Sequence, residues 1–360
     1  MTYATFWKGR RVLITGHTGF KGSWLLILLQ HFGAEVWGVS LEPISQPNLF
    51  HEIATSMPPG DTWHHNITNI LDQEQLVTLV QHIQPEIVFH LAAQALVRQS
   101  YLDSIGTWKT NVIGSLNLLE ALKQLEHICS VVMVTTDKVY VNKAWAHGYR
   151  EIDRLGGHDP YSASKAALEI AITSWRSSFC GPLSHQTPYL RIASARSGNV
   201  IGGGDWSMDR LVPDVISALL AGEPIRLRNP KSIRPWQHVL DPLIGYMHLA
   251  KLLTISSQPP CEAFNFGPYS SSNRTVTDIA NEILKYIPGS IVESNDPNSF
   301  HEESILTLDI AKSASLLSWK PHWTLEETIK RTVNWYTSHN KGISSLACCL
   351  SDLKHFTLIN

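Results

Sequence analysis

The sequence predicts an α/β fold in which a doubly wound parallel sheet is joined to a smaller C-terminal α/β lobe. Two observations predict this fold. Short apolar segments alternate along the chain with longer segments of helical periodicity, which is the pattern of consecutive β–α–β units. The short segments are also apolar almost throughout, as expected of parallel strands that helices cover on both faces.

The first expected unit is a strand, a glycine-rich turn and a helix. Residues 11–15 form the apolar strand, and Gly16-His-Thr-Gly-Phe-Lys-Gly22 separates it from an apolar helix that contains residues 24–29. Gly16 suits a tight turn, Gly19 lets the backbone approach a pyrophosphate, and Gly22 lets the helix pack closely on the sheet. This unit predicts a dinucleotide site with the phosphates at the helix N-terminus.

The remaining units follow in the same order, each strand before its helix. We expect strands at residues 35–40, 87–91, 131–135 and 189–193, and helices at residues 71–82, 110–123 and 162–178. After Gly198 the chain changes to loops rich in glycine, arginine and tryptophan, which suit a substrate-binding lobe. We therefore predict a dinucleotide-binding domain at residues 1–197 and 236–268, and a substrate-binding lobe at residues 198–235 and 269–360.

Tyr161 and Lys165 lie four apart in one expected helix, so their side chains share a helix face. A lysine cation beside a phenol favours the phenolate and lowers the pKa of the tyrosine, so we expect Tyr161 to transfer protons near neutral pH. By itself, such a pair is most often a solvated surface pair. Together with the glycine-rich turn, it predicts an enzyme that uses a nicotinamide cofactor.

The composition fits an enzyme and argues against several other classes. The 360 residues carry 29 basic and 31 acidic side chains, a net charge of −2, so we expect no nucleic-acid partner. No apolar stretch reaches the ~20 residues that span a bilayer, and the first residues lack the apolar segment of a signal peptide. We expect no membrane partner and a cytoplasmic location. The five cysteines have no Cys-x-x-Cys spacing and are expected to be reduced thiols.

His64 and His65 form the most visible histidine cluster, yet we expect no metal site. Neighbouring residues face opposite sides of a strand, and no flanking cysteine or acidic residue completes a ligand set. The two histidines are therefore interpreted as structural side chains.

A further set of motifs carries a family resemblance. Thr135-Thr-Asp-Lys-Val-Tyr140 ends an expected core strand, and Tyr161-Ser-Ala-Ser-Lys165 follows it. With these motifs and the glycine-rich turn, nearly the whole chain resembles the extended short-chain dehydrogenase/reductase superfamily, a Rossmann-type group, and within it the nucleotide-sugar 4,6-dehydratases. Members acting on dTDP-glucose carry Asp-Glu where this sequence has Asp137-Lys138. Asp-Lys, with residues 197–206 and 234–239, resembles the branch that acts on CDP-glucose.

The resemblance implies an NAD-dependent lyase that converts CDP-D-glucose to CDP-4-keto-6-deoxy-D-glucose, a step of deoxysugar biosynthesis for lipopolysaccharide O-antigen. It implies that Tyr161, with Lys165 beside it, takes the proton of the 4-hydroxyl and that Thr136 hydrogen-bonds the same oxygen. Asp137, in its protonated form, donates to the departing 6-hydroxyl. Lys138 either removes the C5 proton or neutralises the developing enolate, and the residues alone leave both roles open.

Two other functions stay open. One is a nucleotide-sugar 4-epimerase, or a dehydratase of another nucleoside-diphosphate hexose, on the same scaffold. The other is a non-catalytic cofactor-sensing protein, against which the intact Thr136, Tyr161 and Lys165 argue. The resemblance also implies a homodimer or homotetramer, paired through the helices expected at 110–123 and 162–178, whose apolar faces carry Leu116, Leu119, Ala166 and Ile170.

The end of the second expected strand favours NAD over NADP. Ser40 and Glu42 lie there, and residues 36–51 contain no lysine or arginine to accept a 2′-phosphate. Asn66 stands where the resemblance implies an adenine-contacting aspartate. The cofactor contacts expected in this fold are Gly16, His17, Gly19, Phe20, Lys21, Gly22, Ser40, Asn66, Ile67, Leu91, Ala92, Ala93, Tyr161 and Lys165.

The two phosphates of the expected substrate need cationic partners. Arg210, Arg228 and Arg234 lie in or near loops of the second lobe, and arginine forks suit phosphate. Arg228 fits a solvated strand edge equally well. The resemblance implies that Asn199 and Arg234 contact the pyrophosphate, and that Gln94 and Arg98 line the sugar pocket.

Overall fold

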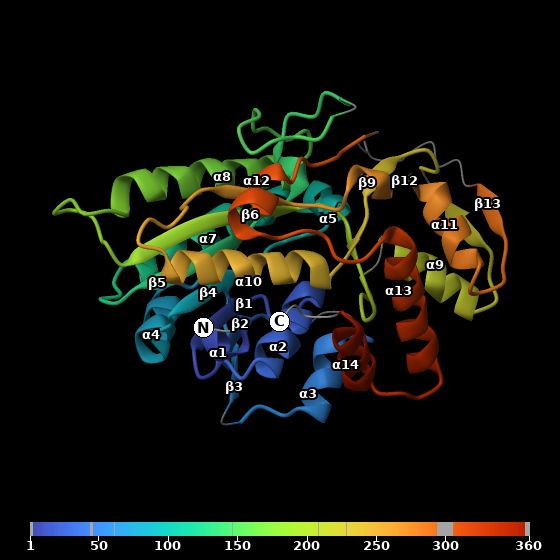
Figure 1. Ribbon diagram of the computed structural model, residues 1–360, viewed down its shortest axis with the longest axis horizontal. Helices are drawn as coiled ribbons and strands as arrows, with labels where there is room; N and C mark the ends of the chain where they lie inside the picture. The colour runs from blue at the N-terminus through green and yellow to red at the C-terminus, as the bar shows by residue number, and fades with distance from the viewer. Residues whose placement is uncertain are drawn as a thin grey trace.

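The computed structural model describes residues 3–43, 46–60, 62–145, 147–207, 209–227, 229–293 and 305–356. Within these ranges, a seven-stranded parallel sheet lies at the centre (Figure 1), in the order β11-β6-β5-β4-β1-β2-β3. The strands are β1 (Arg11–Thr15), β2 (Glu35–Ser40), β3 (Trp63–Ile67), β4 (Ile87–His90), β5 (Cys129–Val134), β6 (Leu190–Ser197) and β11 (Ala263–Phe266). The chain starts in the middle, builds outward to β3, and returns to β4 on the other side of β1. This is the doubly wound topology that the sequence predicts, and the fold class is confirmed.

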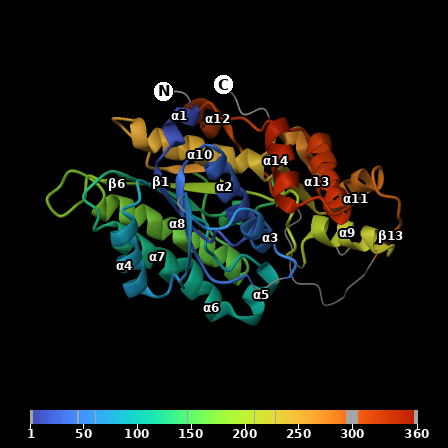
Figure 2. The same cartoon turned by 90° about the horizontal axis from the view of Figure 1, so that it is seen from below.

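Both faces of the sheet are buried, which explains why its strands are apolar almost throughout. Val12 and Ile14 of β1 join one hydrophobic cluster, and Leu13 between them joins the other. Figure 2 shows α2 (Phe20–His31) and α10 (Leu240–Ile255) on one side, and α4 (Gln73–Ile83), α7 (Ser115–Leu122) and α8 (Pro160–Phe179) on the opposite side. The helices on each side supply the apolar side chains of that cluster.

Local sequence sets where α8 begins. Pro160 occupies its first turn, where a missing backbone N–H costs nothing, and Asp159 caps it by accepting from the Ser162 N–H at 2.9 Å. Tyr161 therefore lies in the first turn, at the carboxyl edge of the sheet. The helix expected at 162–178 is confirmed and extends slightly at each end, whereas α4 begins at Gln73, two residues later than expected, after its cap Asp72.

The helix expected at residues 110–123 is interrupted. The structure forms α6 (Ser104–Trp108), a π-helical turn η1 (Lys109–Gly114) and then α7. Inside the wide turn, the amide of Asn111 is satisfied on both sides: Nδ2 donates to the Gln94 carbonyl (3.1 Å) and to Ser164 Oγ (2.9 Å), and Oδ1 accepts from the Gln94 N–H (2.8 Å). Turns of this kind are frequent at functional sites, and their wider geometry has no signature in the apolar spacing.

A second group of elements lies beside the carboxyl edge of the sheet, on the right of Figure 1. It comprises α9 (Leu211–Leu220), β8 (Ile225–Leu227) paired with β13 (Ile291–Glu293), β9 (Ile233–Pro235) paired with β12 (Asn273–Thr275), α11 (Val276–Leu284), α13 (Leu325–Asn340) and α14 (Ser345–His355). One hydrophobic cluster runs from the sheet into α9, α11, α13 and α14. The domain boundaries given above remain a prediction.

Smaller elements complete the described chain. They are α1 (Tyr3–Trp7), α3 (Leu49–Ser56), α5 (Val97–Leu102), the 3-10 turns η2 (Asp137–Val139) and η3 (Ser270–Ser272), α12 (Ala311–Leu317), and the short strands β7 (Val200–Ile201) and β10 (Gln237–His238). Of the helices in the described ranges, none combines the length and apolar character needed to cross a membrane.

The topology places the functional edge of the sheet. The chain leaves β1 toward α2 on one face of the sheet and leaves β4 toward the other face, so the strand order reverses between β1 and β4. In doubly wound sheets, ligands bind outside the carboxyl ends of the strands at such a reversal. Gly16, with φ +79°, makes the turn after β1, and a Cβ there would lie 2.7 Å from the Ala92 backbone nitrogen. Only glycine lets the segments after β1 and β4 approach this closely.

Candidate active site

The turn after β1 has the shape of a dinucleotide site. A Cβ on Gly22 would lie 2.1 Å from the Gly16 carbonyl oxygen, so the helix closes tightly onto the turn. At Gly19, by contrast, a Cβ would meet only the Gly16 carbonyl oxygen, at 3.5 Å. Gly19 is the N-cap of α2 and gives it no side-chain cap. The N–H groups of the first helical turn are therefore suited to bind the phosphates of a dinucleotide.

The end of β2 provides hydroxyl groups rather than cations. Ser40 Oγ lies 2.7 Å from Thr18 Oγ1, and Asn66 Nδ2 donates to the Gly38 carbonyl at 3.3 Å. Ile67, at the end of β3, is exposed. The absence of lysine and arginine from residues 36–51 keeps this corner suited to a ribose with free hydroxyls.

His17 fills the floor of the same corner. Its Nε2 lies 2.6 Å from His65 Nδ1, and burial, with His65 second, lowers the pKa of His17 to about 3. A Cβ on Gly38 would lie 2.4 Å from the His17 ring, so glycine is required there. His64 points to the opposite face of β3 from His65, as expected of consecutive residues on a strand. Its ring stacks on that of Trp37, with 3.7 Å between the ring centroids. In the part of the chain that the structure describes, no three His, Cys, Asp or Glu side chains gather as a metal site.

Tyr161 and Lys165 lie on one buried face of α8. Lys165 Nζ donates to the Val134 carbonyl at the end of β5 (3.2 Å), and burial lowers the pKa of Lys165 to about 8, against the opposing effect of Glu169. Burial raises the pKa of Tyr161 to about 12, although Thr136 and Arg210 act in the other direction. The expectation that Lys165 brings the phenol near neutrality is wrong for this arrangement, because burial of the phenol outweighs the nearby cations.

Thr136, Asp137 and Lys138 follow β5, where the backbone leaves strand geometry for the turn η2. Asp137 Oδ1 accepts from Thr136 Oγ1 at 3.0 Å, and Asp137 Oδ2 is buried with no hydrogen-bond partner among the described residues. Burial raises the pKa of Asp137, although Lys138, Thr136, Arg234 and Lys21 oppose the shift. A raised pKa favours the acid form of this carboxyl, the form that can donate a proton.

Lys21 extends from the glycine-rich turn toward the carboxyl group of Asp137. Its Nζ donates to Ser197 Oγ (2.8 Å), which also accepts from the Tyr246 hydroxyl (2.6 Å). Burial lowers the pKa of Lys21 to about 7, with Arg210 adding to the effect and Asp137 opposing it. Lys21, which the sequence predicts to contact the cofactor, therefore lies between the glycine-rich turn and Asp137.

The expected substrate contacts fall into two groups. Arg234 and Arg210 face the catalytic side chains, since they act electrostatically on Asp137 and Tyr161 respectively. Arg98 forms an ion pair with Asp209 at 3.1 Å, which joins α5 to the loop before α9. Gln94 donates through Nε2 to Thr107 Oγ1 (2.9 Å), and the Asn199 carbonyl accepts from the Gln237 N–H (3.2 Å). Arg228 lies outside the described residues.

Two buried polar residues beside the site escaped the analysis of the sequence. His90, at the end of β4, lies 2.7 Å from Thr15 Oγ1 and 2.8 Å from Ser115 Oγ, and burial, with Lys165 second, lowers its pKa to about 3. Asn111 joins Gln94 to Ser164 of α8. The side-chain hydrogen bonds of both residues run to partners at least 17 positions away in the chain. The one available signal is a polar side chain inside an otherwise apolar segment, as at His90.

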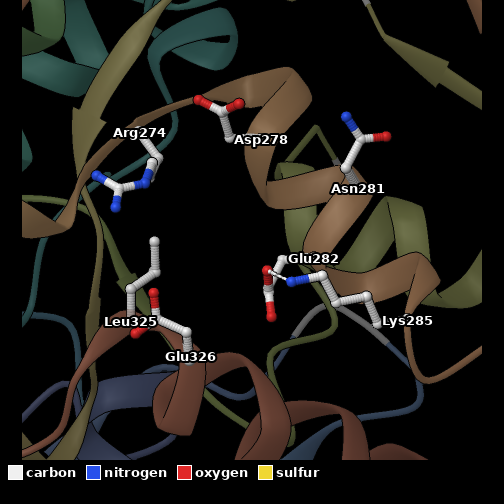
Figure 3. A pocket seen from close by; sticks show the side chains of 7 residues that line it. All are labelled: Arg274, Asp278, Asn281, Glu282, Lys285, Leu325 and Glu326. Atoms are coloured by element: carbon white, nitrogen blue, oxygen red, sulfur yellow. Dashed lines mark hydrogen bonds and ion pairs between the residues drawn. The ribbon is translucent and has the colours of Figure 1, made fainter.

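A separate hollow of about 310 Å³ opens on the surface between α11 and the start of α13 (Figure 3). Its lining mixes acidic and basic side chains, and Glu282 already pairs with Lys285 at 2.5 Å. The residues that line it are Arg274, Asp278, Asn281, Glu282, Lys285, Leu325 and Glu326. None of them belongs to the expected site, and the chemistry of the chain converges instead at the carboxyl edge of the sheet.

The fold and the Thr136, Tyr161 and Lys165 constellation define a Rossmann-type enzyme of the extended short-chain dehydrogenase/reductase superfamily. More narrowly, the chain belongs to the nucleotide-sugar dehydratase family described as GDP-mannose 4,6 dehydratase, whose model matches residues 13–332.

Individual relatives agree with this assignment. The chain is 42% identical to the CDP-glucose 4,6-dehydratase of Salmonella typhimurium, over 98% of this chain and 97% of that protein. It is 25% identical to the UDP-glucose 4-epimerase of Mycoplasma pneumoniae, over 91% of this chain and 96% of that protein. Among solved structures, the dTDP-glucose 4,6-dehydratase of Streptomyces venezuelae, with NAD and TYD bound, superposes with a TM-score of 0.78 at 21% identity and covers 93% of this chain and 99% of that one.

Proposed function

We propose that this chain is an NAD-dependent dehydratase that converts CDP-D-glucose to CDP-4-keto-6-deoxy-D-glucose. NAD as the cofactor is supported by the N-terminus of α2, which has no side-chain cap, by the small Gly19 at that terminus, and by the hydroxyl groups at the end of β2. The 42% identity to a CDP-glucose 4,6-dehydratase supports cytidine diphosphate as the carrier. A place in the cytoplasmic supply of deoxysugars for lipopolysaccharide O-antigen belongs to the same proposal.

The first half of the reaction makes a ketone. NAD held at the N-terminus of α2 would supply the hydride acceptor for C4 and the hydride donor for C6. Tyr161 receives the proton of the 4-hydroxyl and Thr136 holds that oxygen, while a cation such as Lys165 favours the phenolate against the burial that raises the pKa of Tyr161 to about 12. Arg210 acts in the same direction, since it lowers the pKa of Tyr161.

The second half removes water. The C4 ketone acidifies the C5 proton, and Lys138 removes this proton or neutralises the enolate that its removal forms. Asp137 donates a proton to the 6-hydroxyl, which leaves as water and gives a C5–C6 double bond. Return of the hydride to C6 and of a proton to C5 would complete the net loss of one water from the sugar, with no net change in the cofactor.

The observation that carries the proposal is the buried Oδ2 of Asp137, which has no hydrogen-bond partner in the part of the chain that the structure describes. An epimerase needs to remove and return hydride at C4 only, and has no use for a carboxylic acid beside the sugar. A non-catalytic sensor has no use for a buried carboxyl with a raised pKa next to an acid/base tyrosine. A dehydratase requires such a proton donor for the departing hydroxyl.

The proposal is tested by incubating the purified protein with CDP-, dTDP-, GDP- and UDP-glucose and following product mass. We expect loss of one water from CDP-glucose in preference to the other three. Tyr161→Phe is the control: it should bind nucleotide sugar but lose about 10²- to 10⁴-fold in rate, the usual contribution of an acid/base group. Isomerisation without mass change would support an epimerase, and dehydration of another hexose in preference would correct the nucleobase.

We also propose that the chain acts as a homodimer or homotetramer. Leu119 and Ala166 are buried inside the chain, so the expectation that these two face a partner is wrong; they pack beneath their own helices. Ile170 of α8 is 61% exposed and Ile113 of η1 is 50% exposed, and Leu102 and Ile105 on α5 and α6 are exposed as well. A second copy of this chain against these helices would bury the exposed apolar side chains.

A further inference from the structure

A buried ion pair lies behind the catalytic face of α8. Glu169 follows Lys165 by four residues, as Lys165 follows Tyr161, so the three side chains share one helix face. Arg196 of β6 donates to Glu169 Oε2 at 2.7 Å, and the two side chains are 1% and 4% exposed. Burying two charges is costly, and such pairs are weak stabilisers compared with apolar packing. The pair therefore invites a functional explanation.

Both oxygens of Glu169 are held by strands that end in the active site. Oε1 accepts from Thr135 Oγ1 at 2.5 Å, and Oε2 accepts from Ser194 Oγ at 2.8 Å in addition to Arg196. Thr135 directly precedes Thr136 and Asp137 in the chain. One carboxylate thus joins α8, the end of β5 and the end of β6 at a single point.

Arg196 extends this network to the other end of the catalytic turn. Its Nη1 donates to the Tyr140 hydroxyl (2.9 Å) and to the Glu151 carbonyl (3.1 Å). The Tyr140 hydroxyl in turn donates to Asn265 Oδ1 of β11 (2.7 Å). Tyr140 comes directly after the η2 turn, so the segment from Thr136 to Val139 is fixed at both ends by the same ion pair.

The groups around Lys165 show that the Glu169 carboxylate favours the charged form of this lysine. Burial disfavours the Lys165 cation, and Glu169 is the group that opposes this effect. From the neighbouring elements, His90 of β4 and Lys21 of α2 also act on Lys165; burial lowers the pKa of His90 to about 3 and that of Lys21 to about 7, so both are largely uncharged at pH 8. Arg196 of β6 and Arg176, which lies farther along α8, also interact electrostatically with Glu169. Removing the negative charge of Glu169 would leave the effect of burial on Lys165 unopposed.

We propose that Glu169, held by Arg196, is a positioning residue that keeps Lys165 charged and keeps the Thr136–Asp137 segment beside Tyr161. This inference rests on the proposed function only in requiring a substrate that the wild-type protein turns over. It assigns to Glu169 two separable effects. The charge acts on Lys165 along α8, and the hydrogen bond to Thr135 acts on the end of β5.

Glu169→Gln separates the charge effect from simple damage to the fold. The wild-type rate of cofactor reduction in a single turnover should fall as pH rises through about 8, where Lys165 loses its proton. In Glu169→Gln this decline should move by about one pH unit or more toward acid, the size of shift that one nearby charge produces. Thr135→Val keeps the charge and removes the hydrogen bond, so its rate should fall at every pH with the decline near its wild-type position.

Two further variants complete the design. Glu120→Gln on α7, which breaks a surface ion pair with Lys123, is the matched control and should change neither rate nor profile. Glu169→Gln/Arg196→Gln removes both buried charges, and it replaces the single variant if thermal unfolding shows that the single variant does not fold. The pH at which its rate declines should still move toward acid. The shift should be smaller than in the single variant, because the repulsion between Arg196 and Lys165 is removed as well.

The outcomes distinguish this inference from the proposed function. If the wild-type protein turns over no nucleotide sugar, the proposed function fails. If the wild type is active and a folded Glu169→Gln keeps the wild-type pH profile, Glu169 is merely structural and the inference is overturned. If neither the single nor the double variant folds, the ion pair is a requirement of the fold itself, and the positioning role is likewise overturned.

Discussion

Burial of single side chains determines the protonation states that the proposed reaction needs. Burial raises the pKa of Asp137 and so favours its carboxylic acid form, and Lys165 keeps a pKa of about 8 because Glu169 offsets part of its burial. Gly198 contributes by having no side chain: a Cβ there would lie 2.8 Å from Asp137 Oδ2 and 2.7 Å from Pro235 Cγ. Asp137 can therefore keep its position only because residue 198 has no side chain.

Gly198→Ala should impair the elimination step. The new methyl group must push Asp137 or Pro235 aside, and a displacement of about 1 Å at a reacting group costs on the order of 10²-fold in rate. Steady-state kinetics should show a lower kcat with little change in KM. Gly60→Ala, at a position where a Cβ meets nothing within 4 Å, is the control and should be neutral. Normal turnover by Gly198→Ala would mean that Asp137 does not need its present position.

Lys138→Met should leave the oxidation at C4 largely intact and slow the loss of water. Methionine keeps the length of the side chain but removes its charge and basicity, so the ketone stage should persist. Absorbance at about 340 nm, which reports reduced nicotinamide, should then rise and remain during a single turnover. Lys143→Met, in the exposed segment that follows, is the matched control. Wild-type behaviour of Lys138→Met would show that the C5 proton is removed by another group.

At the scale of elements, the sequence predicts what local spacing encodes and misses what distant contacts create. Residues 35–40 are a strand with the expected bounds because an apolar run flanked by polar residues is a local signal. The π-helical turn at Lys109–Gly114 is different, because it exists to let Asn111 reach Gln94 and Ser164. Glu169 and Arg196 were missed for the same reason: their pairing depends on how α8 packs on β6.

α14 carries a buried acid that should make stability depend on pH. Asp352 Oδ2 lies 4.0 Å from His238 Nε2, and burial raises the pKa of Asp352 from 3.8 to about 7. The folded protein thus holds this proton more tightly than the unfolded chain does. Stability should therefore fall as pH rises from 3.8 through about 7, and the loss should be complete above that pH.

Asp352→Asn should consequently raise the melting temperature at pH 8. The gain in unfolding free energy should be about 1–4 kcal/mol, since one pKa unit corresponds to about 1.4 kcal/mol. The difference in melting temperature between Asp352→Asn and the wild type should shrink as pH falls toward 4, where Asp352 in the folded protein is uncharged, as asparagine is. Glu126→Gln, an exposed acid, should have no such effect. A melting temperature that is equal or lower at pH 8 would show that the Asp352 carboxylate is stabilised in the folded protein.

At the scale of the whole molecule, the site is assembled from both parts of the chain. The sheet supplies the cofactor turn, Asp137 and the helix with Tyr161, whereas Arg210 and Arg234 come from the segments after β6. The order of these motifs could be predicted from the sequence. The sequence does not predict which arginines lie beside the catalytic side chains, because this depends on how the later segments pack against the carboxyl edge of the sheet.

The exposed apolar side chains of α5, α6, η1 and α8 lead to a prediction about assembly. Light scattering should give a mass at least twice that of the 40.3 kDa chain. Ile170→Arg should shift the protein toward the monomer, because an arginine cannot be buried unpaired at the centre of an apolar interface. Ile255→Arg, at an equally exposed position at the end of α10, should leave the mass unchanged. A wild-type protein that is monomeric at all concentrations would contradict this interface.

The most direct test of the account follows the hydrogen on C4. CDP-glucose labelled with deuterium at C4 is incubated with the wild-type protein, and the product is examined by NMR and mass spectrometry. The account predicts a 4-keto-6-deoxy sugar that has lost one water and carries the deuterium at C6, because the hydride that leaves C4 returns there. Deuterium retained at C4, in unchanged substrate or in its C4 epimer, would contradict it.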